Sequence, residues 1–310
     1  MTSPANFPPP PKGKNGWPWT TERDSLEDSE AVSIDCPKIT IVTPSFNQGM
    51  FIEATIRSVL LQNYSNLEYI IVDGGSTDNS TNVIKKYESW ISYWVSEPDN
   101  GQYDAINKGF SVSTGEIMLW LNSDDMLVSG SLQALGGIFR SLHENVRWVT
   151  GCPFYWDVDG NMYRIINPFI YNRRLMQIGG YNSRAIGWVM QEGTAWCRSL
   201  WDDAGGYVDS SLTYAADFDL WHRFSFYDQL YSVSSLIGGN RCWPGQKTAD
   251  VASYDREIDR ILRRRRFCRF SNILLRNRYL RSCIRIYLSF SKTKTQITYD
   301  PRAMRWQLGA

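Results

Sequence analysis

The chain has 310 residues, 43% of them hydrophobic, which is enough for a sizeable core and excludes a fibrous or collagen-like protein. Its net charge of +1 provides no overall field that would attract nucleic acid. The two histidines, His143 and His222, exclude a histidine-rich metal site, and the six scattered cysteines form no Cys-x-x-Cys pair, which favours reduced thiols in a cytoplasmic protein.

The first residues, 1–36, differ in composition from the rest of the chain. They are Pro-rich and then acidic, and they lack the apolar segment of a signal peptide. We expect a leader that is extended or loosely docked, with Trp17 and Trp19 attaching part of it to the body. No run of 18 apolar residues occurs anywhere, so no transmembrane helix is predicted.

After the leader, short apolar segments alternate with segments of helical periodicity. Strands are predicted at 39–43, 69–72, 93–96 and 117–121, and helices at 51–60, 80–87 and 103–110. Because the connections are short, this alternation predicts a doubly wound, Rossmann-like α/β sheet with mostly parallel strands. Residues 149–240 are less regular and rich in aromatic side chains, apart from a helix expected at 217–226, and we expect this half to pack on the sheet.

Each of the four predicted strands ends in a polar or acidic loop. Ligands of parallel sheets bind at the carboxyl ends of the strands, so these loops predict a binding site. Asp124 and Asp125 are paired carboxylates of the kind that hold Mg²⁺ or Mn²⁺ against substrate phosphates, or they cap a helix that begins near Ser129. Asp73 and Asp99 each precede glycine-containing turns, which either bind a nucleotide or are plain turns.

The second half contains three further candidates. Asp217 opens a predicted helix, where it is either a general base or an N-cap. Arg241 and Lys247 flank a Trp-Pro-Gly turn and could close over phosphates, although a plain surface loop is the alternative. His222, on the same helix as Asp217, is expected to be a packed side chain.

Taken together, these segments resemble the family 2 glycosyltransferases of GT-A fold. The resemblance covers about 38–248 and leaves both termini out. It is carried by the order and spacing of nine segments, at 41–47, 72–78, 99–101, 107–109, 121–125, 196–201, 205–209, 217–221 and 244–248. It implies that 37–250 form a GT-A domain whose irregular aromatic half lies on the acceptor side.

The resemblance also implies an activity, namely inverting transfer of a sugar from a nucleotide diphosphate donor, a UDP- or dTDP-sugar, to an acceptor hydroxyl. It places Asp124 and Asp125 at a divalent cation, Mn²⁺ or Mg²⁺, and gives Asp217 the role of the base that takes the acceptor's proton. The residues implied in donor binding are Pro44, Ser45, Asp73, Asp99, Gly101, Asn107, Lys108 and Asp124.

Two positions depart from the family pattern. Asn122 stands where the metal-binding D-x-D motif begins with an aspartate, and Trp243 stands where relatives often have a histidine before the Pro-Gly-Gln-Lys-Thr segment. Both changes reduce the ligands available to a metal ion. Glu192 is a rival candidate for the base. The candidates for binding the acceptor or the phosphates are Glu192, Trp196, Arg241 and Lys247.

Two other functions stay open at this point. A sugar nucleotidyltransferase would need a Gly-rich, basic loop after the first strand, whereas 44–49 contain no Lys or Arg. A non-catalytic carbohydrate-binding or scaffold protein could have kept the fold, but the acidic pair and the candidate base are both present. The expected acceptor is a glycan or lipid-linked glycan in polysaccharide or glycoconjugate assembly, and no nucleic acid is expected as a partner.

The last segment, 251–310, has 15 Lys and Arg residues against 4 Asp and Glu residues, and its composition predicts a basic helical tail. Apolar side chains alternate with arginines there, which indicates peripheral contact with an anionic membrane; a helix packed on the body is the alternative. The apolar residues concerned are Ile258, Ile261, Leu262, Phe267 and Phe270. We therefore expect a cytoplasmic protein at the inner face of the membrane.

Overall fold

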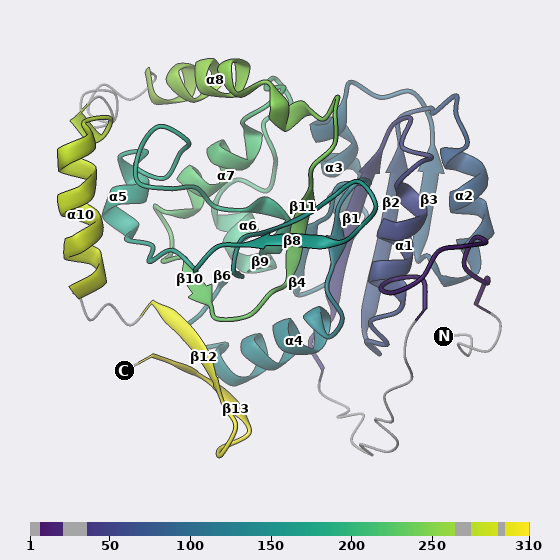
Figure 1. Ribbon diagram of the computed structural model, residues 1–310, viewed down its shortest axis with the longest axis horizontal. Coiled ribbons are helices and arrows are strands. Elements are labelled where there is room, and N and C mark those ends of the chain that lie inside the picture. Colours follow the sequence, from purple (N-terminus) through teal and green to yellow (C-terminus); the bar gives the residue numbers. More distant parts are fainter. Residues whose placement is uncertain (1–6, 21–35, 264–273, 291–294, 310) are drawn as a thin grey trace.

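The computed structural model describes residues 7–20, 36–263, 274–290 and 295–309 and contains two β-sheets (Figure 1). The main sheet has nine strands in the order β13-β12-β10-β6-β9-β4-β1-β2-β3. Its strands are β1 (Ile39–Ser45), β2 (Leu67–Asp73), β3 (Tyr93–Ser96), β4 (Ile117–Trp120), β6 (Trp148–Thr150), β9 (Thr194–Cys197), β10 (Tyr231–Val233), β12 (Gln296–Asp300) and β13 (Arg305–Leu308). The small sheet, in the order β5-β11-β7-β8, comprises β5 (Met126–Leu127), β7 (Phe154–Trp156), β8 (Met162–Ile165) and β11 (Gly238–Arg241).

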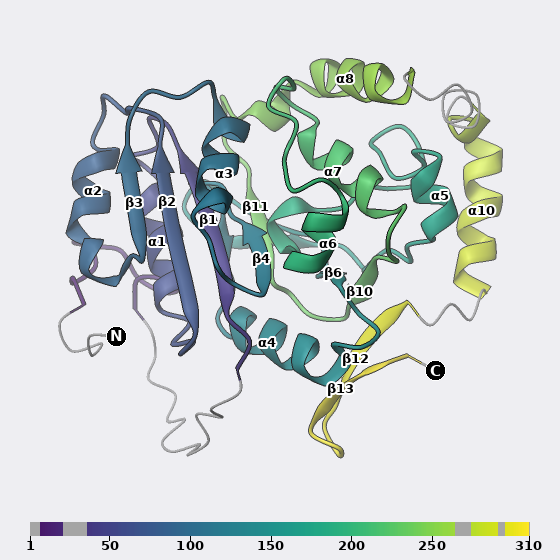
Figure 2. The ribbon, with the colours of Figure 1, turned by 180° about the vertical axis from the view of Figure 1, so that it is seen from behind.

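Helices cover both faces of the main sheet, with α1 on one face and α3 on the other (Figures 1 and 2). The α-helices are α1 (Ile52–Leu60), α2 (Ser80–Lys86), α3 (Gln102–Ser111), α4 (Ser131–Leu142), α5 (Arg173–Gln177), α6 (Arg198–Asp203), α7 (Ala216–Phe224), α8 (Val251–Arg263) and α10 (Arg278–Phe290). Short 3₁₀ turns are η2 (Glu88–Trp90), η3 (Gln191–Gly193) and η4 (Lys247–Ala249).

The first half confirms the predicted parallel α/β arrangement. β1, β2, β3 and β4 run parallel in the order β3-β2-β1-β4. β1 is buried along its whole length, as expected for a central strand covered on both faces. α3 approaches β1 very closely at Gly109, where a Cβ atom would lie 2.5 Å from Cγ1 of Val42. The carboxyl ends of β1 and β4 are thereby fixed next to the start of α3.

The second half makes the main sheet mixed. β9 pairs antiparallel with both β4 and β6. Aromatic side chains of the two halves form a buried core: Trp120 of β4 stacks on Trp221, and Trp196 meets both rings edge to face. Trp148 and Phe224 complete this cluster. The tryptophans here stabilise the junction of the two halves.

The described part of the leader, 7–20, is attached to the body rather than loose. Trp17 donates its indole N–H to the carbonyl of Leu127, as its predicted anchoring role requires. The buried Arg57 guanidinium donates to the carbonyls of Pro8, Pro18 and Trp19. Charge-assisted bonds of this kind are the stronger hydrogen bonds of proteins.

The prediction of a wholly helical tail is wrong. β12 extends the main sheet next to β10, and β13 forms its edge. In α8, Ile258, Ile261 and Leu262 are buried in the core, so they do not face a membrane. Phe267, Phe270 and the 264–266 arginines lie outside the described residues. Within the described part of the chain, no helix is long and apolar enough to span a bilayer.

Candidate active site

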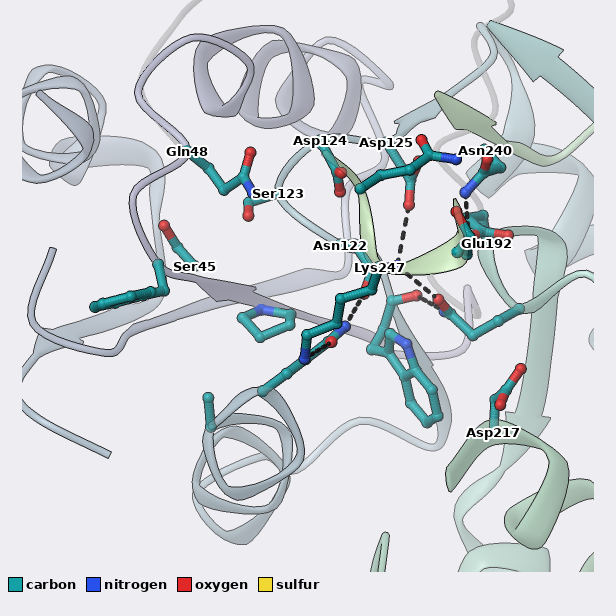
Figure 3. Close-up of a pocket in the computed structure, with 18 of the residues that line it drawn as sticks. Ser45, Gln48, Asn122, Ser123, Asp124, Asp125, Glu192, Asp217, Asn240 and Lys247 are labelled. Atoms are coloured by element: carbon teal, nitrogen blue, oxygen red, sulfur yellow. Dashed lines mark hydrogen bonds between the residues drawn. The ribbon is translucent and has the colours of Figure 1, made fainter. Parts of the chain in front are cut away.

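A cavity of about 300 Å³ opens at the carboxyl ends of β1 and β4, where the two halves meet (Figure 3). This is the edge of the sheet at which the acidic loops were predicted to gather. Ser45 and Gln48 lie on one side of the cavity, and Glu192 and Asp217 lie on the other. The polar and aromatic residues in its wall include Ser45, Asp99, Gln102, Tyr103, Asn122, Asp124, Asp125, Gln191, Glu192, Asp217, Asn240, Trp243, Lys247 and Tyr254, and Pro44 lies beside Ser45.

Of the predicted donor-binding residues, Pro44, Ser45 and Asp99 line the cavity at its sheet side. The hydroxyl of Ser45 is buried and has no hydrogen-bond partner among the described residues, so it is available to a ligand. Asp99 packs directly on Gly74, where a Cβ atom would lie 2.8 Å from its Oδ2 atom. The glycine after β2 therefore makes room for this carboxylate.

Asp73 lies behind the cavity wall instead of in it. Its carboxylate is fully buried and accepts hydrogen bonds from the backbone N–H and hydroxyl of Ser76 and from the hydroxyl of Ser96. Asp73 at the end of β2 pairs with Ser45 at the end of β1. The bonds to Asp73 therefore fix the loop that follows β2, next to the cavity residue Ser45. Asp73 thus positions the site without reaching the cavity.

Three other predicted donor residues are also absent from the cavity wall. Asn107 uses its side-chain amide to bind both the N–H and the carbonyl of Val208. Lys108 is directed to Glu97, with Nζ 3.1 Å from Oε1. Gly101 precedes α3 with a φ of 105°, a left-handed conformation that suits glycine. These residues place α3 and join it to the second half.

The acidic pair has an asymmetric environment. Asp125 is 1% exposed, and both of its oxygens accept bonds, Oδ1 from the backbone N–H of Arg241 at 2.7 Å and Oδ2 from Nδ2 of Asn122 at 3.0 Å. Oδ2 of Asp124 accepts a hydrogen bond from the indole N–H of Trp243 at 2.8 Å. Burial raises the pKa of both carboxyls, and repulsion from Asp124 and Glu192 adds to the rise for Asp125.

Asn122, which replaces an aspartate of the family pattern, is held by a chain of amide hydrogen bonds. Gln102 donates to its Oδ1 at 2.7 Å, and its Nδ2 lies 3.2 Å from Oε1 of Gln191. Lys247 in turn donates to Oε1 of Gln102 at 3.1 Å. An aspartate at 122 could not donate to Asp125, so the amide avoids placing another carboxylate against a buried one.

The cavity wall offers few ligands to the predicted divalent cation. Within the described residues, no group of three or more His, Cys, Asp or Glu side chains is placed to hold a metal ion. Asp125 has both oxygens engaged, so Asp124 is the carboxylate with an oxygen left over. Mg²⁺ and similar ions are commonly held by one or two carboxylates together with substrate phosphates. The oxygen ligands that the cavity offers therefore fit a cation that is also bound by a phosphate-bearing ligand.

Two buried carboxyls occupy the opposite side of the cavity. Burial raises the pKa of Asp217 to about 7, and the nearby Glu192 contributes to the rise. Oδ1 of Asp217 has no hydrogen-bond partner among the described residues, and Oδ2 lies 3.5 Å from the hydroxyl of Tyr254. Burial also raises the pKa of Glu192, which accepts from the side chain of Asn240 at 3.3 Å. A carboxyl with a pKa near 7 can exchange a proton at neutral pH.

Two of the predicted acceptor or phosphate contacts are excluded by their positions. Trp196 is fully buried in the aromatic core. Arg241 is 3% exposed and faces away from this cavity, donating to the carbonyls of Asp124 and Val158. Trp196 was singled out because it lies in a segment that matches the family, and Arg241 because it flanks the Trp-Pro-Gly turn, but each is needed for packing. Lys247 does line the cavity, and burial lowers its pKa.

Gln102, Tyr103 and Tyr254 are among the cavity residues that sequence reasoning missed. Gln102 and Tyr103 directly follow the Asp-Asn-Gly turn, and their position at the first turn of α3 was the signal that could have identified them. Tyr254 comes from α8, inside the segment interpreted as a tail, and no local pattern indicates it. His222, as expected, is a packed side chain, 4% exposed with Nε2 3.0 Å from the carbonyl of Gln177.

Comparison with known proteins gives consistent matches. The family described as Glycosyl transferase family 2 matches residues 40–196. An uncharacterized glycosyltransferase of Mycobacterium tuberculosis is 36% identical over 107 residues, which are 33% of this chain and 41% of the relative. An uncharacterized glycosyltransferase of Rickettsia typhi is 25% identical over 68% of this chain and 66% of its own length. The match thus spans about two-fifths of the mycobacterial relative and about two-thirds of the rickettsial one.

Among solved structures, S. aureus TarS (residues 1–349) in complex with UDP-GlcNAc superposes with a TM-score of 0.55, at 15% identity and over 76% of this chain and 73% of that one. The mannosyltransferase PcManGT of Pyrobaculum calidifontis, solved with GDP-Man and Mn²⁺, superposes with a TM-score of 0.51, at 16% identity and over 70% of this chain and 60% of that one. At these identities the likeness concerns the fold.

Proposed function

Because the chain belongs to glycosyl transferase family 2 and is a glycosyltransferase, we propose that it transfers a sugar from a nucleotide diphosphate donor to an acceptor hydroxyl with inversion. One observation carries this proposal: a single cavity has Asp124 and Lys247 on its donor side and the buried Asp217 opposite them. The arrangement provides phosphate and base contacts around one reacting centre.

On the donor side, Ser45 and Asp99 would contact the nucleotide, and Lys247 would contact the diphosphate. The Lys247 ammonium is the one basic group among the described residues that line the cavity. Asp124 would hold Mn²⁺ or Mg²⁺ together with the donor's phosphates, and the ion would neutralise charge on the departing diphosphate. We assign this role to Asp124 and give Asp125 the task of fixing the loop, because hydrogen bonds engage both Asp125 oxygens.

On the acceptor side, Asp217 would accept the proton of the attacking hydroxyl. The acceptor oxygen forms its bond to the anomeric carbon as the bond from that carbon to the diphosphate breaks, through an oxocarbenium-like state. The electron pair leaves with the diphosphate, and the proton goes to the free Oδ1 of Asp217. Base assistance of this kind contributes roughly 10²–10⁴-fold to the rate. Glu192 would bind the acceptor, since it lines the cavity on the same side as Asp217.

We further propose that the acceptor is a glycan or a lipid-linked glycan of polysaccharide or glycoconjugate assembly. With Ile258, Ile261 and Leu262 of α8 buried, contact of the described residues with an anionic membrane would involve α10. Tyr279 and Tyr287 are each 70% exposed there, and Ile286 is 57% exposed. Tyrosine and isoleucine beside arginines are typical of helices at a lipid surface.

The proposal is tested by titrating UDP, dTDP and GDP into the parent protein with and without Mn²⁺. UDP and GDP belong in the panel because the structural neighbours were solved with UDP-GlcNAc and GDP-Man. We expect one nucleotide to bind, Mn²⁺ to tighten the binding, and Asp124→Ala to abolish that gain. Asp217→Asn should bind as the parent does yet lose transfer. If no nucleotide binds to the folded protein, the scaffold function is favoured instead.

A further inference from the structure

In the part of the chain that the structure describes, the candidate base has only a weak side-chain hydrogen bond to hold it. α7 begins at Ala216, and its N-cap residue, Ala215, has no side chain that could accept a backbone N–H. The N–H groups at a helix start need partners when they are not exposed to water. Within the described residues, Asp217 accepts a side-chain hydrogen bond only from the hydroxyl of Tyr254, at 3.5 Å. The orientation of Asp217 therefore depends on whatever holds the segment before α7.

Glu257 of α8 holds that segment. Its carboxylate accepts the backbone N–H groups of three consecutive residues, Thr213 at 2.9 Å, Tyr214 at 2.8 Å and Ala215 at 2.9 Å. A charged acceptor makes these bonds stronger than neutral ones, and a carboxylate at a helix N-terminus also interacts favourably with the helix dipole. Glu257 thus caps α7 from a different helix, two residues before the base.

The same helix continues directly from the loop on the donor side. Lys247 and Thr248 line the cavity, and α8 begins at Val251 (Figure 2). The Lys247 ammonium lies 5.8 Å from the ring centre of Tyr103 and donates to Gln102. One continuous stretch of chain therefore contacts the donor side through Lys247, the base through Tyr254, and the segment before the base through Glu257.

We propose that Tyr254 and Glu257, both on α8, are positioning residues for Asp217. The inference rests on the proposed function, because it takes Asp217 as the base. Glu257 acts through the backbone of 213–215, and Tyr254 acts by donating its hydroxyl to the Asp217 carboxylate.

The ionisable groups around Asp217 define the expected pH behaviour. Glu192 faces Asp217 from η3, Tyr103 from α3 and Tyr254 from α8. Glu257 lies close enough to Tyr103 for its charge to raise the pKa of that hydroxyl. Glu192 favours the protonated form of Asp217 by repulsion, whereas the Tyr254 hydroxyl favours the charged form. Loss of that hydroxyl should therefore raise the pH at which the base becomes active.

The experiment compares Tyr254→Phe and Glu257→Gln with Asp255→Asn, a matched control. Asp255 lies on the same helix but pairs with Arg184 and Ser183, away from the base. Affinity for the nucleoside diphosphate that binds is measured together with kcat for transfer, or for donor hydrolysis with water as the acceptor. We expect nucleotide affinity within about twofold of the parent in all three, which also shows that they fold, and a kcat about tenfold lower for Glu257→Gln, as for a lost charged hydrogen bond.

For Tyr254→Phe, the acid limb of the kcat profile should move up by about half a pH unit, as for one weak hydrogen bond to a carboxylate. Wild-type profiles in both variants, alongside an inactive Asp217→Asn, would overturn the positioning roles and leave the base in place. An active Asp217→Asn would instead overturn the base assignment, and the positioning roles with it. An equal loss of kcat in Asp255→Asn would reduce Glu257 to a general stabiliser of α8.

Discussion

Replacement of Asp217 by Asn should make the protein more stable at neutral pH while it removes transfer activity. The carboxyl is buried, and burial raises its pKa to about 7 from the ordinary 3.8. In the unfolded chain the same carboxyl loses its proton near pH 4. Between those two values the folded state binds more protons than the unfolded state, so parent stability falls as pH rises through this window. Above pH 7 the full penalty of the buried charge is present.

The size of the effect follows from that shift. About three pKa units, at 1.36 kcal/mol each, correspond to roughly 4 kcal/mol of destabilisation above pH 7. Asparagine carries no charge but still places a polar group in the same site, which lowers the expected gain to about 2–4 kcal/mol. A gain of 2 kcal/mol raises the Tm of a domain of this size by about 4 °C. Below pH 4 the gain should vanish, because Asp217 is then protonated in both states.

Thermal unfolding of the parent and Asp217→Asn, recorded at pH 4, 6 and 8, measures this directly and needs no substrate. The difference in Tm should grow from pH 4 to pH 7 and stay constant above it. Asp219→Asn is a suitable control, since the Asp219 carboxylate pairs with Arg223 one turn along α7. Its neutralisation should make the protein less stable. If Asp217→Asn gains no more at pH 8 than at pH 4, Asp217 is not a strained carboxyl and its assignment as a base poised near neutrality fails.

Three further changes test separate parts of the structure. Lys247→Ala should weaken nucleoside diphosphate binding, measured by calorimetry, by at least about tenfold, the loss expected for a charged hydrogen bond. Lys108→Ala changes a lysine outside the cavity and should leave the affinity unchanged. Trp196→Ala should cost about 3–5 kcal/mol in denaturant unfolding, because it empties the aromatic core. Arg57→Met should release 7–20 and speed tryptic cleavage after Lys14; an unchanged rate would show that the leader is held without Arg57.

The parts of the fold that the sequence predicted are those governed by local periodicity. β1 to β4 and α1 to α3 alternate in short segments, and each structural boundary lies within two residues of the predicted one. Asp99, Asp124 and Asp125 were also predicted correctly as cavity residues, because the carboxyl ends of parallel strands necessarily share one edge. These predictions needed no information about distant contacts.

What could not be predicted depends on contacts between remote segments. Trp196 stands in a matching segment and Arg241 flanks the Trp-Pro-Gly turn, but whether such a side chain faces the core or the cavity is decided by the strand that pairs with its own. Nothing local encodes that partner. The tail shows the same limit. β12 is a strand because it pairs with β10 at the edge of the main sheet, although the composition of the tail predicts a helix. Tyr254 and Glu257 reach the site only because α8 folds back over α7.

The charge balance of the cavity explains why donor and cation should bind together. Among the described residues of its wall, five are carboxylic acids (Asp99, Asp124, Asp125, Glu192 and Asp217), and Lys247 is the one base. A diphosphate that entered alone would add negative charge to buried groups that already resist ionisation. Two remedies exist: a divalent cation enters with the diphosphate, or carboxyls take up protons as it binds. Calorimetry in buffers of different ionisation enthalpy separates them, because proton uptake on nucleotide binding should be large without Mn²⁺ and small with it.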